Sequence, residues 1–323
     1  MHASRPEEPP EHPTNHRKKH QINGVNVIAY RGRFAPTPSG PLHFGSMVAA
    51  VGSYLDARSQ GGTWALRIDD LDPPRVAAGS VDSIFRCLEK FQMAWDGDVV
   101  FQSARADAYR NAIDQLRGRG LVYACACSRK EVADAALDGP DGPVYPGTCR
   151  NGMHAGRDMR AWRVRTSAVP IAFADLLQGA VSQDLEREIG DYVLLRADDV
   201  VAYHLACAVD DGAQGITHVV RGADLLSSTP RQIYLQRLLG LPTPAYLHLP
   251  VALNAAGEKL SKQTLARAVD PERAAAVLAD VLRFLNHPPP SEIGADDLAA
   301  LWDWAVRHWQ RERLPAAADM PAG

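Results

Sequence analysis

The stretch from Arg31 to Ala50 constrains the fold more than any other part of the chain, because it joins an apolar run to a helix through a loop. Residues 25–30 form a short apolar run typical of a buried strand, and residues 47–55 carry small and apolar side chains at helical spacing. Regular structure is prevented between them by four residues: Pro36, Pro38, Gly40 and Pro41. A helix that begins after such a loop presents free backbone N–H groups and the positive end of its dipole, so the stretch predicts an anion site.

Three residues of this loop favour a nucleotide as the anion. Gly40 and Gly45 lack a Cβ atom, so a phosphate can approach the backbone. His43 comes just before the predicted helix, where its imidazole can donate a hydrogen bond to a phosphate. A plain turn with a surface histidine is the alternative, and a second motif is needed to decide between the two.

A second motif follows far downstream at Lys259-Leu-Ser-Lys-Gln263, after a turn at residues 254–257. Lys259 and Lys262 lie three residues apart on this loop. Both can reach a triphosphate and stabilise the negative charge that develops during displacement at the α-phosphate. Alone, a Lys-x-x-Lys pair is more often a solvated surface.

Strand and helix patterns alternate along the chain. Strands are predicted at residues 63–68, 99–101, 216–220 and 246–253, and helices at residues 80–95, 105–118 and 228–239. This alternation predicts an α/β fold with a doubly wound, Rossmann-type parallel sheet. Two further helices, after residue 270, predict a short C-terminal helical region.

The composition is that of a globular protein. The 323 residues are 46% hydrophobic, and a net charge of −3 with a pI near 6.4 gives no sign of a nucleic-acid partner. The sequence contains no apolar run of about 18 residues and no secretory signal, so no membrane association is predicted. Five cysteines, an odd number, fit a reducing compartment and predict a cytoplasmic protein. Cys87 and Cys207 are expected in the core, on a predicted helix and strand.

Three of the cysteines cluster in a region rich in glycine and proline. Cys125, Cys127 and Cys149 supply three thiols, which can occupy three corners of a tetrahedral zinc site. His154 is the ordinary chemical choice for a fourth ligand, and three buried or free thiols without a metal are the alternative. Four protein ligands would make the zinc structural, because no position stays open for water.

The two loop motifs together resemble the signature motifs of class I aminoacyl-tRNA synthetases. Pro-x-Pro-x-Gly-x-Leu-His-x-Gly, which ends at Gly45, is similar to the HIGH-type motif, and Lys259 to Gln263 is similar to the KMSKS-type loop. The resemblance implies that His43, Lys259 and Lys262 carry catalysis. It also implies an ATP site, with Mg²⁺ on the phosphates, made by Gly40, His43, Gly45, Ser46 and Lys262.

The sequence from Arg33 to Gly40 resembles that of the glutamate-specific branch of these enzymes. The implied glutamate site consists of Arg33, Phe34, Ala35, Pro36, Thr37, Asp69, Tyr203 and Arg221. Arg221 follows a predicted strand and offers a planar, bidentate partner for a carboxylate, and an ion pair with Asp224 is either the alternative or a companion contact. Asp69 stands where that branch has a glutamate that helps hold the substrate amino group, so its side chain is one methylene shorter. An acidic turn is the alternative for Asp69.

The cysteine region, Gln263 and the early end of the chain resemble the glutamyl-queuosine tRNA(Asp) synthetases, which lack an anticodon-binding domain. This resemblance implies Tyr145 as the fourth zinc ligand, and the compact turn from Tyr145 to Cys149 favours it over His154. It further implies that L-glutamate is activated by ATP and transferred to queuosine at the wobble position of tRNA(Asp). The alternatives are a shortened glutamyl-tRNA synthetase that charges the tRNA 3′ end, and a catalytically silent nucleotide- or RNA-binding module.

The expected domain division follows from these motifs. It comprises a disordered tail (1–24), the first half of the catalytic domain (25–120), an inserted zinc-bearing subdomain (121–190), the second half of the catalytic domain (191–265) and the C-terminal helical region (266–323). Residues 160–166 and 170–175 are predicted to form a hairpin of the inserted subdomain. Nothing in the sequence demands more than a monomer.

Overall fold

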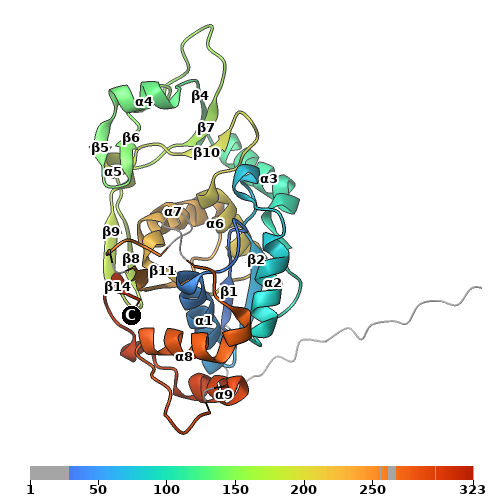
Figure 1. The fold of residues 1–323 in the computed structure, drawn as a ribbon. Coiled ribbons are helices and arrows are strands. Elements are labelled where there is room, and N and C mark those ends of the chain that lie inside the picture. The colour runs from blue at the N-terminus through green and yellow to red at the C-terminus, as the bar shows by residue number, and fades with distance from the viewer. Residues whose placement is uncertain (1–28, 255, 261–266, 295, 323) are drawn as a thin grey trace, which may run out of the picture.

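The computed structural model describes residues 29–254, 256–260, 267–294 and 296–322. A central sheet carries helices on both sides, with the inserted region at one end of the molecule and the C-terminal helices α8 and α9 at the other (Figure 1). In these ranges, no helix is both long and apolar enough to cross a membrane.

The sheet consists of two groups of strands that meet at the first strand. The Thr217 N–H donates to the Arg31 carbonyl oxygen at 2.9 Å and so joins the two groups. The strands in order are β3 (Val100–Phe101), β2 (Thr63–Ile68), β1 (Arg31–Phe34), β11 (His218–Gly222), β12 (Ala245–Leu249), β8 (Ile171–Asp175) and β9 (Gly179–Gln183). All neighbours within the groups are parallel except β8 and β9. The predicted parallel α/β fold is therefore confirmed.

The first strand lies later in the chain than predicted. The sequence placed it at residues 25–30, of which 25–28 lie outside the described residues, whereas β1 pairs with β2 from Arg31 to Phe34. Arg33 in this strand is only 3% exposed and forms an ion pair with Asp211. A search for apolar runs misses such a strand, because it contains a charged residue. Arg33 can nevertheless be buried, since Asp211 neutralises its charge.

Helices cover the two faces of the sheet and form two cores. Successive side chains of β2 point to opposite faces, so Trp64, Leu66 and Ile68 join one core and Ala65 joins the other. The helices of the first core are α1 (Phe44–Ser59), α2 (Ser80–Lys90), α8 (Ala274–Phe284) and α9 (Leu298–His308). Those of the second core are α3 (Ala106–Gly118), α6 (Tyr203–Ala213) and α7 (Thr229–Leu239).

The inserted region has a sheet of its own. Its elements are β4 (Val122–Cys125), α4 (Arg129–Ala135), β5 (Leu137–Gly139), β6 (Gly142–Val144), β7 (Ala161–Val164), α5 (Leu185–Glu188) and β10 (Val193–Arg196). The predicted hairpin is wrong, because β7 pairs with β4 and β10, while β8 pairs with β9 and reaches β12 of the main sheet. β10 follows the predicted boundary at residue 190 and yet pairs with β7 of the insert.

The C-terminal region returns to the catalytic half of the chain. Asp56 on α1 is 0% exposed and accepts hydrogen bonds from Trp309 Nε1 at 3.1 Å and Arg311 Nε at 2.6 Å. β14 (Asp319–Pro321) pairs in parallel with β13 (Val251–Leu253). Short 3-10 helices complete the described fold: η1 (Pro73–Arg75), η2 (Gln102–Arg105), η3 (Ala223–Ser228), η4 (Pro271–Arg273) and η5 (Arg311–Arg313).

Candidate active site

Three of the predicted substrate residues, Thr37, Asp69 and Tyr203, line a cleft between the parallel strands and the inserted region. The cleft has a volume of about 920 Å³. The inserted region contributes four arginines to its lining: Arg129, Arg160, Arg163 and Arg196. In a doubly wound sheet, ligands bind at the carboxyl ends of the strands where the order reverses, which is here between β1 and β11.

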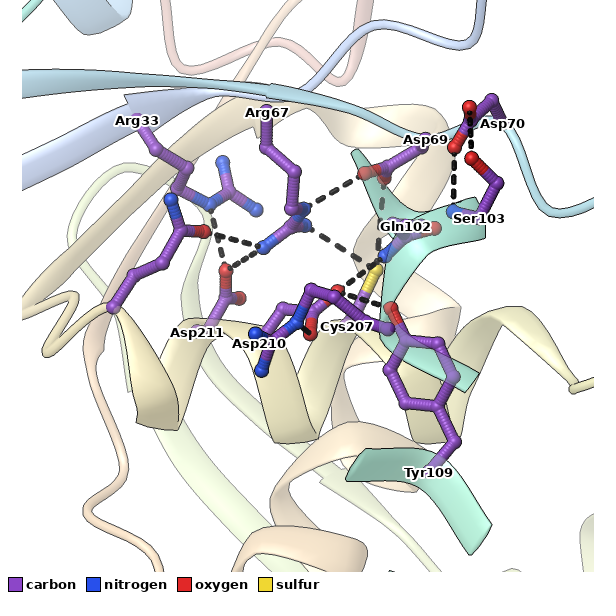
Figure 2. Close-up of polar contacts among 12 residues, drawn as sticks. Arg33, Arg67, Asp69, Asp70, Gln102, Ser103, Tyr109, Cys207, Asp210 and Asp211 are labelled. Carbon is purple, nitrogen blue, oxygen red and sulfur yellow. Dashed lines mark hydrogen bonds and ion pairs between the residues drawn. The ribbon is translucent and has the colours of Figure 1, made fainter. Parts of the chain in front are cut away.

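Two arginines and two aspartates form a buried charge network at this edge (Figure 2). Oδ1 of Asp211, on α6, accepts hydrogen bonds from Arg67 Nη1 at 2.6 Å and from Arg33 Nε at 3.2 Å. Arg67 Nε donates to Asp69 Oδ1 at 2.7 Å. All four side chains are buried, so the network holds Arg33 on β1 and Asp69 directly after β2 in fixed positions.

The two carboxyl groups of this network differ in their pKa. Burial acts to raise the pKa of Asp211, but Arg33 and Arg67 outweigh it and lower the pKa below its ordinary value. Burial raises the pKa of Asp69, and Arg67 offsets this only in part. Arg33 and Arg67 therefore favour the ionised form of Asp211. A substrate ammonium group beside Asp69 would lower the pKa of Asp69 and favour its ionised form.

The sequence analysis missed Arg67 and the two consecutive aspartates of α6. The signal for Arg67 was a charged residue in the middle of an apolar strand, which needs a buried partner. Asp210 is 0% exposed and accepts hydrogen bonds from Tyr109 OH at 2.7 Å and Gln102 Nε2 at 2.9 Å. Two adjacent buried aspartates on one helix therefore bind separate partners, and only Asp211 contacts the arginines of β1 and β2.

Both cysteines outside the cluster are buried, as predicted. Cys87 lies on α2, and Cys207 lies on α6 rather than on the predicted strand. Arg67 Nη2 lies 3.6 Å from Cys207 Sγ, so this thiol contacts the charge network. Burial raises the pKa of Cys207 to about 12, which keeps the thiol protonated.

The five residues from Arg33 to Thr37 do not all present side chains to the cleft. Phe34 is buried in the first core and stacks on Trp64, with ring centres 6.1 Å apart. The Pro36 carbonyl oxygen accepts the Asp69 N–H at 3.0 Å. Phe34, Ala35 and Pro36 can therefore offer only backbone groups to a polar ligand, whereas Arg33 and Thr37 carry polar side chains.

Arg221 is placed at the end of β11 and is 5% exposed. Its Nε donates to His248 Nε2 at 3.0 Å and its Nη2 donates to Thr229 Oγ1 at 2.7 Å. Its buried Nη1 has no hydrogen-bond partner among the described residues. The ion pair with Asp224, predicted as the alternative or a companion contact, does not form, because Asp224 pairs with Lys259. Asp224 lies in η3, which begins directly after β11. Its Oδ2 is 2.5 Å from Lys259 Nζ, so Asp224 forms an ion pair with Lys259.

Tyr203 begins α6 and lines the cleft. Burial raises the pKa of its phenol, and the nearby Arg221 guanidinium acts in the opposite direction. The structure thus brings Tyr203, Asp69 and Arg221 near one another from three distant parts of the sequence.

His43 caps the N-terminus of α1. Its Nδ1 accepts the Ser46 backbone N–H at 3.3 Å, so the proton of the neutral ring is on Nε2, from which it can be donated to a phosphate. Gly40, in the loop before the helix, has a φ of 138°, a conformation that L side chains rarely adopt. The predicted anion loop is therefore present, with its histidine at the helix terminus.

The lysine loop approaches this anion loop. A Cβ atom on Gly45 would lie 3.3 Å from the Leu260 carbonyl oxygen, so the close contact favours glycine. Lys259 is held beside Asp224, and Lys262 and Gln263 lie outside the described residues.

The cysteine cluster forms a compact set of possible metal ligands. The sulfur atoms of Cys125, Cys127 and Cys149 lie within 4.8 Å of one another. Tyr145 OH lies 3.3 Å from Cys125 Sγ and 3.7 Å from Cys127 Sγ, whereas His154 is exposed and does not belong to this group. Zinc with Zn–S bonds of about 2.3 Å requires ligands about 3.8 Å apart, so this set fits a tetrahedral zinc ion with Tyr145 as the fourth donor.

Arg163 links the cysteine cluster to the cleft. Its Nε donates to Cys125 Sγ at 3.3 Å, and its guanidinium carbon lies 3.7 Å from the centre of the Tyr145 ring. Burial acts to raise the pKa of Cys125, but hydrogen bonds from Tyr145, from the Cys127 N–H and from Arg163 together lower it. A thiolate is the form that binds zinc.

Comparisons with known proteins agree with this geometry. The family model described as "tRNA synthetases class I (E and Q), catalytic domain" matches residues 29–277. The Glutamyl-Q tRNA(Asp) synthetase of Dechloromonas aromatica is 58% identical over 88% of this chain and 96% of that protein. The one of Aromatoleum aromaticum is 57% identical over 88% of this chain and 90% of that protein.

Solved structures show the same fold at lower identity. A glutamate tRNA ligase from Elizabethkingia meningosepticum has a TM-score of 0.74 at 23% identity, covering 89% of this chain and 66% of that one. The Glutamate-tRNA Synthetase of Elizabethkingia anophelis has a TM-score of 0.75 at 23% identity, covering 90% of this chain and 68% of that one. The chain thus spans about two thirds of these solved chains. Because the family model covers most of its length and curated relatives exceed 50% identity, the chain belongs to the class I tRNA synthetases of the E and Q group.

Proposed function

We propose that the protein activates L-glutamate with ATP and transfers it to queuosine at the wobble position of tRNA(Asp). The name shared by relatives at 56–58% identity supports this reaction. The observation that carries the choice of glutamate is the charge pattern of the cleft edge. Arg33 and Arg221 supply two cationic groups and Asp69 supplies one carboxylate, which complement the two carboxylates and the ammonium group of glutamate.

The three charged contacts have different roles in this proposal. The unpartnered Nη1 of Arg221 binds a substrate carboxylate, and Arg33 binds the other carboxylate or shares the same one. Asp69 binds the ammonium group, with Tyr203 beside it in the cleft. Glutamine should be rejected, because its amide would leave a buried guanidinium poorly paired.

The activation step is an in-line displacement. A carboxylate oxygen of glutamate attacks the α-phosphorus of ATP, and pyrophosphate leaves with the broken bond's electrons. His43 Nε2 and the N-terminus of α1 hold the phosphates, while Lys259 and Lys262 stabilise the charge of the transition state. Mg²⁺ bound with ATP would neutralise the leaving pyrophosphate. No side-chain nucleophile is needed, since positioning of the two substrates supplies most of the rate.

The transfer step brings tRNA to the same cleft. The chain has a net charge of −3, but the cleft side of the inserted region is lined by Arg129, Arg160, Arg163 and Arg196. Local guanidinium groups of this kind bind phosphates of a nucleic acid despite the overall charge. We further propose that the enzyme is a cytoplasmic monomer. We keep the domain division expected from the sequence, except that β8 and β9 belong to the main sheet and β10 belongs to the insert.

Glutamate-dependent exchange of pyrophosphate with ATP tests the activation step. Lys262→Ala is expected to lower exchange by orders of magnitude while glutamate binding survives. Unchanged exchange in this variant would contradict the assignment of the lysine loop, and absence of exchange in the wild-type protein would favour the silent binding module.

The acceptor is tested with radioactive glutamate and an anticodon stem–loop of tRNA(Asp), prepared with and without queuosine. Labelling only of the queuosine-containing stem–loop supports the proposal, because this fragment has no acceptor end. Labelling restricted to whole tRNA, independent of queuosine, would instead favour charging of the 3′ end.

We also propose a structural zinc ion held by Cys125, Cys127, Tyr145 and Cys149. Bound zinc is measured by metal analysis of the purified protein and by its release to a chromophoric chelator. Tyr145→Phe should speed this release, whereas His154→Ala should not change it. The reverse pattern would make His154 the fourth ligand.

A further inference from the structure

Arg221 has a buried nitrogen atom without a partner. Its guanidinium group is fixed through two of its three nitrogen atoms, because Nε binds His248 and Nη2 binds Thr229. The third, Nη1, is buried and has no hydrogen-bond partner in the part of the chain that the structure describes. An unpaired buried donor is costly, so its persistence indicates a place for an acceptor from the substrate.

The partner of Arg221 Nε is a fully buried histidine on the adjacent strand. His248 lies directly opposite Arg221 in the parallel pairing of β11 and β12, and it is 0% exposed. An imidazole nitrogen can accept a hydrogen bond from a guanidinium only when it carries no proton. Nε2 of His248 must therefore be the unprotonated nitrogen, and its proton must be on Nδ1.

Asp175 at the end of β8 fixes this tautomer. Its Oδ2 lies 2.6 Å from His248 Nδ1, which donates to it. Its Oδ1 accepts the backbone N–H groups of Leu177 at 3.0 Å and Gln178 at 2.9 Å. Burial lowers the pKa of His248 even though Asp175 acts in the opposite direction, so the ring stays neutral beside the guanidinium. Asp175 is thus held by the backbone and in turn holds the ring.

We propose that Asp175 and His248 are positioning residues that orient Arg221 so that Nη1 points at the carboxylate of the substrate glutamate. The three side chains form a line of hydrogen bonds across three adjacent strands, β8, β12 and β11. A side chain bound in this way cannot turn to accommodate an amide, so the line also sets the preference for glutamate over glutamine. This inference rests on the role of Arg221 in the proposed function.

Two substitutions of His248 separate its contacts. In His248→Gln, the side-chain carbonyl oxygen can occupy the place of Nε2 and still accept from Arg221. In His248→Asn, the shorter amide can still donate to Asp175 but does not reach Arg221. We expect His248→Asn to raise the KM for glutamate about tenfold and to weaken rejection of glutamine, with kcat and the KM for ATP little changed. His248→Gln should stay within about threefold of the wild type.

His287→Asn is the control for a general effect of replacing a buried histidine. His287 is 1% exposed, and its ring contacts the Leu285 carbonyl oxygen and the Gln310 N–H, in the C-terminal region. This variant should leave the KM for glutamate unchanged. The inference is overturned if His248→Asn leaves that KM unchanged, if His248→Gln raises it equally, or if His287→Asn raises it as much.

A second pair keeps the test available if His248→Asn does not fold. Thr229→Val removes the oxygen that accepts from Arg221 Nη2 at nearly constant volume, and Thr229→Ser retains it. The valine variant should raise the KM for glutamate and the serine variant should not. Equal kinetics in the two variants would overturn the positioning of Arg221 by these neighbours.

Arg221→Ala distinguishes failure of the inference from failure of the proposed function. An unchanged KM for glutamate in this variant would contradict the proposed role of Arg221 itself. A raised KM in Arg221→Ala together with a wild-type KM in His248→Asn would contradict the positioning line alone.

Discussion

Asp56 and Asp211 are similarly buried aspartates on opposite faces of the sheet, and only one of them serves the cleft. Asp56 on α1 is 0% exposed, and Asp211 on α6 is 3% exposed. Asp56 binds Tyr30 OH at 2.5 Å and also Trp309 and Arg311, so its partners are residues that fasten the C-terminal region to the catalytic half.

Asp211 has a different set of partners. It neutralises Arg33 and Arg67, and Arg67 extends the network to Asp69 at the wall of the cleft. Asp56 and Asp211 therefore have similar burial and the same charge. They differ because only the partners of Asp211 extend to an open cleft. An ion pair in the interior marks a candidate site only when its members also reach a surface where a ligand can bind.

The largest expected effect comes from removing each carboxylate in turn. Asp211→Asn should lower the free energy of unfolding by about 3–5 kcal/mol, because it leaves the buried Arg33 and Arg67 without their counter-charge. Asp56→Asn should lower it by less, because the Arg311 side chain is 25% exposed. Only Asp211→Asn should also raise the KM for glutamate. Urea unfolding and pyrophosphate exchange measure the two effects. The comparison fails if Asp56→Asn raises that KM to the same extent.

Replacing an arginine by lysine on each face has a smaller effect. Arg33→Lys keeps the charge but loses the planar fork, and we expect a rise of about 10- to 100-fold in the KM for glutamate, the cost of one charge-assisted hydrogen bond. Arg311→Lys changes the partner of Asp56 in the same way and should lower stability without changing the KM. Equal KM values in the two variants would show that Arg33 has only a structural role.

The nucleotide loop and the lysine loop could be recognised from the sequence only together, because each motif alone also fits a plain turn or a solvated surface. The three cysteines were recognisable by their clustering, and Tyr145 was implied by the family resemblance; these side chains lie together in the structure. The strand at residues 63–68 was also predicted with the bounds that β2 has. These features depend on local chemistry and local periodicity.

The remaining errors concern contacts between distant segments. An ion pair with Asp224, three residues away, was the alternative or companion contact for Arg221, but the register of β11 against β12 places His248 directly opposite Arg221. The partner strands of β7 and β8 were also misassigned, because a hairpin pattern does not reveal that a chain crosses between two sheets. Strand register and sheet membership are set by the whole fold and are not encoded in the spacing of neighbouring residues.

The smallest expected effect is a pH dependence of the free energy of unfolding, caused by His204 on α6. Burial, with a contribution from Arg231 and Arg221, lowers the pKa of His204 to about 3. Below about pH 6.5, His204 binds a proton in the unfolded chain but stays neutral in the folded chain. The free energy of unfolding is therefore unaffected by His204 above pH 6.5 and decreases as the pH falls from 6.5 toward 3. At pH 5 the loss is about 2 kcal/mol. His204→Gln should therefore lose about 2 kcal/mol less unfolding free energy than the wild type between pH 7 and pH 5. His308→Gln, on the exposed side of α9, should keep the wild-type dependence, and a wild-type dependence in His204→Gln would assign the acid sensitivity to another group.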